Sequence, residues 1–186
     1  MNFNQFTIKA QEAVQQAQQV AAVAAHPSID TAHLLKGILL TDEQLSGFLF
    51  KKMGVNPTRI AQGLDALLQA LPKVSGSNQL QLSSSANQVL IQSLSFLKEF
   101  GDEFVSIEHL LLALAKSNDA VGNLLKDAGV QEKALKAAIK ELRGGESVKS
   151  QDAEATYQSL NKYAKNLNDL AKTGKLDPVI GRDEEI

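Results

Sequence analysis

The chain has 186 residues and a net charge of −2 at pH 7, with 44% hydrophobic and 22% charged residues. This length suits one or two small domains, and so small a net charge does not favour nucleic acid or an anionic membrane as a partner. The absence of cysteine excludes disulfides, thiolate metal sites and cysteine nucleophiles. The first residues, MNFNQFTIKA, show no signal-peptide pattern and no apolar stretch approaches a membrane span, so we expect a cytoplasmic location.

One pattern occurs twice along the chain, over about residues 6–71 and again over residues 82–142. The segment HPSIDTAHLLKGIL (26–39) matches DEFVSIEHLLLAL (102–114), which places His33 onto His109 at an offset of 76 residues. LFKKMGVN (49–56) then matches LLKDAGVQ (124–131) with one residue deleted. Repeats of this kind indicate a duplicated structural unit.

Each copy is predicted to form four helices. The first helix of the first copy has apolar residues at helical spacing, and the equivalent positions of the second copy are apolar except Ser93. Thr7 and Ser83 are expected to cap these helices, and Asp30 and Ser106 the next ones. The predicted fold class is all-α, with two pseudo-symmetric four-helix repeats in residues 1–143. The first-helix positions are Ala10, Ala13, Val14, Ala17, Val20, Ala21 and Ala24, matched by Ala86, Val89, Leu90, Ser93, Phe96, Leu97 and Phe100.

The composition changes after the second copy. Residues 144–156 have two adjacent glycines and no apolar stripe, which predicts a flexible linker. Residues 157–186 begin with a further amphipathic helix and end in KLDPVIGRDEEI.

No motif for catalysis is found in the sequence. There is no phosphate-binding pattern of Gly, four residues and Gly-Lys-Ser/Thr, no His-Glu-x-x-His and no Gly-x-Ser-x-Gly. His33 and His109 could form a symmetric metal site, but we favour residues that bond locally at helix starts, because no further ligand accompanies them. We therefore predict a non-catalytic repeat domain that holds no metal.

Two features are candidates for binding. Ile91 and Leu94 lie outside the shared apolar stripe, where the first copy has Gln15 and Gln18. They could line an exposed apolar groove or be covered by another part of the chain. Thr7, Asp102 and Glu108 fall at helix starts or in the loops before them. There they could stabilise the helix ends or form the rim of a binding surface.

The segments IDTAHLLKGIL and VSIEHLLLAL resemble the Clp N-terminal domain, a double four-helix repeat at the front of Clp AAA+ unfoldases. The segment YQSLNKYAKNLNDLAKTGKLDPVIGRDEEI resembles the ClpB family of protein disaggregases. This resemblance implies that residues 157–186 begin a first AAA+ nucleotide-binding domain and that the chain is a fragment. Val179 and Ile180 would then contact adenine only in the full-length parent.

The resemblance also implies a function. The domain would capture unfolded or aggregated polypeptide in an apolar groove, and the parent would be an ATP- and Mg-dependent homohexamer that works with an Hsp70-type system. The alternative is an adaptor-docking domain of a protease-linked Clp unfoldase. The fragment itself would be no enzyme and would bind neither nucleic acid nor membrane. The implied substrate-binding residues are Thr7, Leu90, Ile91, Leu94, Asp102, Glu108 and His109, of which His109 departs from the family pattern.

Overall fold

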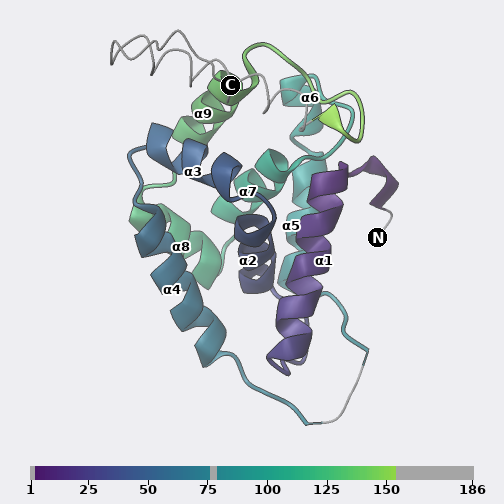
Figure 1. Ribbon diagram of the computed structural model, residues 1–186, viewed down its shortest axis with the longest axis vertical. Helices are drawn as coiled ribbons and strands as arrows, with labels where there is room; N and C mark the ends of the chain where they lie inside the picture. Colours follow the sequence, from purple (N-terminus) through teal and green to yellow (C-terminus); the bar gives the residue numbers. More distant parts are fainter. Residues whose placement is uncertain (1–2, 76–78, 154–186) are drawn as a thin grey trace, which may run out of the picture.

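The structure, a computed structural model, describes residues 3–75 and 79–153. These residues form nine α-helices and one short 3-10 helix, with no strand among them (Figure 1). None of the described helices is both long and apolar enough to cross a membrane. The predicted all-α class is confirmed. The elements are η1 (Phe3–Gln5), α1 (Ile8–Val23), α2 (Thr31–Thr41), α3 (Glu43–Lys52), α4 (Pro57–Ala70), α5 (Ser84–Leu94), α6 (Leu97–Phe100), α7 (Ile107–Ala115), α8 (Ala120–Ala128) and α9 (Glu132–Arg143).

Local chemistry sets the helix ends. The Thr7 hydroxyl accepts the Ala10 N–H at 3.1 Å, and the Ser83 hydroxyl accepts the Ala86 N–H at the same distance. The first helix of each copy therefore starts with the same cap, as predicted. Gly129 ends α8 with a φ of 109°, a left-handed conformation that suits glycine.

The first helix of the second copy differs from the prediction. The apolar stripe predicted one helix through Phe100, but α5 ends at Leu94 and α6 begins at Leu97. The Ser93 hydroxyl donates to the Leu90 carbonyl at 2.6 Å, and the Ser95 hydroxyl donates to the Gln92 carbonyl at 2.6 Å. Serine bonds of this kind compete with the helical ladder, so this helix is divided in two. The eight predicted helices correspond to these nine because α5 and α6 together take the place of one.

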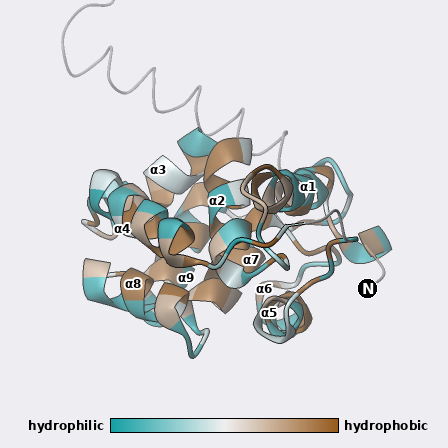
Figure 2. Ribbon diagram, turned by 90° about the horizontal axis from the view of Figure 1, so that it is seen from below, coloured by the Kyte–Doolittle hydropathy of each residue, from teal (hydrophilic) through white to brown (hydrophobic). Residues whose placement is uncertain are grey.

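The two copies share one core. α2 and α7 lie in the middle of the molecule, with α1 and α5 on one side and α3, α4 and α8 on the other (Figures 1 and 2). Isolated bridges join Phe6 to Val105 and Ile29 to Leu82, so the start of each first helix lies beside a loop of the other copy. This exchange makes a pseudo-two-fold arrangement, and buried residues of both copies belong to a single cluster.

Residues 144–153, called the strap here, lie against the repeat domain. The Val148 side chain is fully buried, and Ala153 packs against the core. The strap is the described part of the segment predicted to be a flexible linker, and its contacts are more extensive than that prediction suggests. The other domain limits stay predictions, because residues 154–186, with Val179 and Ile180, lie outside the described residues.

Candidate functional site

A histidine occupies the same position in the second helix of each copy. The Asp30 N–H donates to His33 Nδ1 at 2.8 Å, and the Ser106 N–H donates to His109 Nδ1 at 2.8 Å. A backbone N–H can donate only to an unprotonated ring nitrogen, so both imidazoles carry their proton on Nε2. The predicted local bonding at helix starts is confirmed. Within residues 3–75 and 79–153, no group of three or more metal-ligating side chains is present.

The two Nε2–H groups have different partners. His33 Nε2 lies 2.7 Å from His26 Nδ1, whereas His109 Nε2 lies 2.7 Å from Asp102 Oδ2. Positions 26 and 102 are equivalent in the repeat, so one copy has a neutral imidazole pair and the other has a carboxylate. Burial, followed by the nearby His26, lowers the pKa of His33 to about 4. The first copy therefore keeps this pair neutral at pH 7.

Asp102 belongs to a buried polar cluster formed with Arg143, Glu108 and His109. Arg143 Nη1 donates to both Asp102 carboxylate oxygens, at 2.8 and 2.6 Å, and its Nε and Nη2 each lie 3.2 Å from Glu108 Oε2. Burial alone would raise the pKa of Asp102. Hydrogen bonds from His109, the Val148 N–H and Arg143 outweigh that effect and hold the pKa below its ordinary value. The carboxylate is thus ionised and oriented.

The cluster joins three separate parts of the chain. Asp102 comes from the loop after α6, Glu108 from the first turn of α7, and Arg143 from the last residue of α9. The Arg143 guanidinium also lies over the Phe100 ring, 5.1 Å from its centroid. Sequence reasoning missed Arg143. The available signal was the pair of carboxylates, Asp102 in a loop and Glu108 at a helix start. If both are buried, they need a buried cation as a partner.

The structure places the predicted site residues in two settings. Thr7, Leu90, Asp102, Glu108 and His109 are buried, and the last three meet around Arg143. Ile91 is 53% exposed and Leu94 is partly buried against the core. Among the predicted substrate-binding residues, Ile91 and Leu94, named the apolar α5 surface here, are therefore the ones whose side chains can contact a ligand. The buried residues lie beneath or beside the surface.

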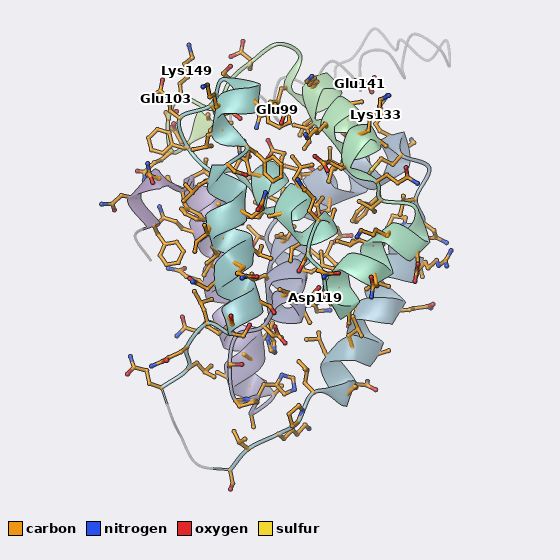
Figure 3. The ribbon with its side chains drawn as sticks, turned by 180° about the vertical axis from the view of Figure 1, so that it is seen from behind. Glu99, Glu103, Asp119, Lys133, Glu141 and Lys149 are labelled. Atoms are coloured by element: carbon orange, nitrogen blue, oxygen red, sulfur yellow. The ribbon has the colours of Figure 1, made fainter. Side chains whose placement is uncertain are left out.

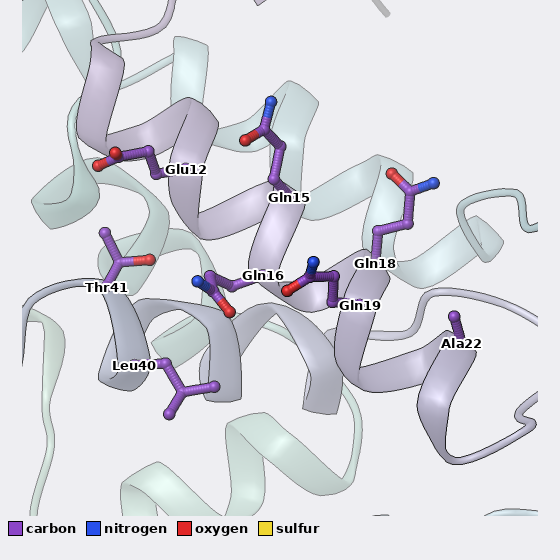
Figure 4. A pocket seen from close by; sticks show the side chains of 8 residues that line it. All are labelled: Glu12, Gln15, Gln16, Gln18, Gln19, Ala22, Leu40 and Thr41. Atoms are coloured by element: carbon purple, nitrogen blue, oxygen red, sulfur yellow. The ribbon is translucent and has the colours of Figure 1, made fainter.

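The equivalent face of the first copy is polar. Glutamines of α1 line a groove of about 560 Å³ with Leu40 and Thr41 of α2 (Figure 4). Gln15 and Gln18, which correspond to Ile91 and Leu94, belong to this groove. Its amides can donate and accept hydrogen bonds, and Glu12 adds one carboxylate to the lining. The first copy thus has glutamines beside the exposed Leu40, at the positions where the second copy has Ile91 and Leu94.

Two four-helix units around one core, the second of which holds the buried polar cluster of Asp102, Glu108 and Arg143, define a double-repeat helical domain. The family comparison agrees with this class. The chain belongs to the Clp repeat N-terminal domain family, whose model matches residues 5–128.

Known proteins support the same assignment. The chain is 52% identical to the chaperone protein ClpB of Bacteroides thetaiotaomicron, over 100% of this chain and 22% of that protein. It spans about a fifth of the length of the curated relatives it matches. The N-terminal domain of Hsp104 from Candida albicans has a TM-score of 0.71 at 24% identity, over 81% of this chain and 99% of that one. A ClpV N-domain, solved in complex with a VipB peptide, has a TM-score of 0.60 at 13% identity, over 74% and 86%. The predicted resemblance to the ClpB family is confirmed.

Proposed function

We propose that this domain binds unfolded or aggregated polypeptide and delivers it to an ATP-dependent disaggregase. The observation that carries the proposal is the apolar α5 surface, where Ile91 is 53% exposed on a helix whose counterpart carries glutamine. Covering such a side chain with an apolar group of a partner is favourable, because it removes apolar area from water. The chaperone relatives and the peptide-bound ClpV N-domain support a polypeptide as that partner.

The size of this surface favours weak and unselective binding. Two apolar side chains supply little directional recognition and distinguish poorly between sequences, which suits a client without fixed structure. In a homohexameric parent, several such domains would act together and raise the effective concentration of sites. The ATP, the Mg and the Hsp70-type partner belong to that parent in this proposal.

The buried residues of the predicted site would act indirectly. Leu90 fills the core directly below the apolar α5 surface, and Thr7 caps α1. Asp102, Glu108 and His109 fix the loop and helix ends at one end of that surface through Arg143. Their substitution would alter binding by moving the surface, and it would also lower stability.

The test is the double variant Ile91→Gln, Leu94→Gln, which copies Gln15 and Gln18 of the first copy. Loss of two apolar contacts of about 1 kcal/mol each should weaken binding of a reduced, alkylated model protein by roughly tenfold or more. The free energy of unfolding should change by no more than about 1 kcal/mol, because neither side chain is fully buried.

The matched control is Gln15→Ala, Gln18→Ala on α1, which should leave binding unchanged. Equal client affinity in the control and in the double variant would contradict the proposed function. Affinity and thermal unfolding are measured on the same preparations, so a loss of folding is not mistaken for a loss of binding.

A second candidate is adaptor docking. The ClpV N-domain in complex with a defined peptide supports it, because that peptide has one particular sequence. Peptides of equal composition and scrambled order separate the two functions. Client capture requires similar affinities for the scrambled set, whereas adaptor docking requires one order to bind far more tightly than the others.

A further inference from the structure

The strap is held mainly through its main chain. The Val148 N–H donates to Asp102 Oδ1 at 2.8 Å, and the Val148 carbonyl accepts the Glu103 N–H at 2.8 Å. Three residues further on, the Gln151 carbonyl accepts the Ile8 N–H at 2.8 Å. The only fully buried side chain among residues 144–153 is that of Val148.

The groups that bond to the strap are oriented by the rest of the fold. Ile8 is the first residue of α1, so its N–H has no acceptor within the helix. The Asp102 carboxylate is fixed by Arg143 at 2.6 Å and by His109 at 2.7 Å. Two N–H donors, one oriented carboxylate and one apolar pocket therefore face the strap.

Most strap side chains take little part. Lys149 and Ser150 are exposed, and Figure 3 shows Lys149 beside Glu103 at the outer edge of the molecule. The Gln151 amide adds bonds to the Asn4 and Phe6 carbonyls, at 3.2 and 3.3 Å. Main-chain hydrogen bonds with a pocket for a side chain are one of the recurring means by which proteins bind extended peptides.

We propose that the surface under the strap is a second polypeptide-binding site, occupied in cis by residues 146–151 and open to an extended segment with a branched apolar residue in the place of Val148. The tether gives the strap a high effective concentration, so a client would compete only when the strap is released or when many segments are present. This site is separate from the apolar α5 surface and does not depend on it.

The test uses the full chain and a fluorescent peptide with the strap sequence, GGESVKSQDA. Wild type should bind the peptide weakly, because its own strap occupies the site. Val148→Asp should release the strap, since a carboxylate cannot enter a dry apolar pocket near Asp102 and Glu103. Peptide affinity should then rise at least tenfold, measured by fluorescence anisotropy. The same peptide with Asp in place of Val should not bind either protein.

Hydrogen exchange reports on the site itself. In Val148→Asp the Ile8 and Glu103 amides should exchange faster, and added peptide should slow them again. Lys149→Ala is the control, with exchange as in wild type. Val148→Gly removes the buried side chain without adding charge. In this variant the Ile8 and Glu103 amides should also exchange faster, and added peptide should slow them again.

Three results would overturn the proposal: unchanged protection of both amides in Val148→Asp, faster exchange without peptide binding, or equal binding of the Asp-containing peptide. The Ile91→Gln, Leu94→Gln changes, added to Val148→Asp, should leave strap-peptide affinity intact. Failure of the second site and failure of the apolar α5 surface are therefore distinguishable.

Discussion

Positions 26 and 102 are equivalent in the two copies, but their side chains need different surroundings. His26 accepts a hydrogen bond from His33 and both rings stay neutral, whereas the carboxylate of Asp102 must be paired because it is buried. Arg143 supplies that pairing at 2.6 Å and 2.8 Å. A buried charge that loses its partner costs about 3–5 kcal/mol, so this one arginine matters to the fold as much as a large core residue.

The stability of the domain should fall as the pH is lowered from about 6.5 towards 4. The pKa of folded His33 is about 4, below its ordinary value of 6.5, so the unfolded chain binds a proton more readily. The stabilisation is complete above pH 6.5 and is lost progressively as the pH falls through this window. Its size is on the order of 3 kcal/mol. Urea unfolding at a series of pH values measures this loss of stability. The other ionisable groups around the imidazole pair are Asp30 and Lys73, with His26 as the partner of His33.

His33→Gln is the control for this pH effect. Glutamine at the third helical position can still accept the Asp30 N–H, but it does not titrate. The variant should show a flatter profile between pH 6.5 and 4.5 than wild type. Equal slopes would assign the pH dependence to other groups, such as His26, whose pKa is also lowered by burial. Asp102 would not account for it, because its lowered pKa places its loss of stabilisation at more acid pH.

Helices α1 and α2 approach each other closely at one glycine. A Cβ on Gly37 would overlap the Ala13 carbonyl oxygen and lie 3.0 Å from the Ala17 nitrogen. These are backbone atoms of α1, so the helices would have to separate. Gly37→Ala should therefore lower the free energy of unfolding by about 2 kcal/mol or more, as overpacked cores do, measured by denaturant unfolding.

Gly47 in α3 provides the matched comparison. It lies in a helix interior, and a Cβ added there would have open space within 4 Å, so alanine meets no obstacle. Gly47→Ala should raise stability by about 0.5–1 kcal/mol through its better helix propensity. If Gly37→Ala raised stability as Gly47→Ala does, close packing against α1 would not be the reason for glycine at position 37.

Helix starts were predictable because their causes are local. Thr7, Asp30 and Ser83 cap the helices that follow them, and those bonds need only neighbouring residues. The break after Leu94 was not predictable from periodicity, since the apolar stripe continues across it and the competing serine hydroxyls leave no periodic signal. The same spacing argument did separate buried Leu90, which belongs to the stripe, from exposed Ile91, which lies outside it.

The strap and Arg143 were missed for a different reason. The strap contributes one buried side chain, Val148, and is otherwise held by its main chain, which any sequence can supply. Arg143 is 41 residues from Asp102 and meets it only after the helices have packed. Contacts of this kind depend on the assembled fold, so they have no counterpart in local sequence patterns.

For the whole molecule, the shared core predicts that the two copies unfold together. Buried residues of both copies form one cluster, and each copy contributes a bridge to the first helix of the other. Neither repeat could unfold alone without exposing to water the apolar residues of the other repeat. Scanning calorimetry should show a single transition, with calorimetric and van't Hoff enthalpies equal.

Variants in one copy check this coupling. Gly37→Ala in the first copy should lower the single transition temperature without creating a second transition. Two resolved transitions, of which only one moves, would show that the repeats are separate folding units and would contradict the shared core.

The exchange of histidine for aspartate also gives the domain a direction. The first helices of the two copies each begin beside the far end of the other, with Phe6 next to Val105 at one end and Ile29 next to Leu82 at the other. Had both ends kept paired imidazoles, the helix pair would look alike from either end. Because Asp102 and Arg143 lie at only one end, the two ends of the α1–α5 helix pair differ in structure, and the pair has a defined direction. Because both groups are buried, this difference acts through the strap and the helix ends that they hold, and not through direct contact with a bound polypeptide.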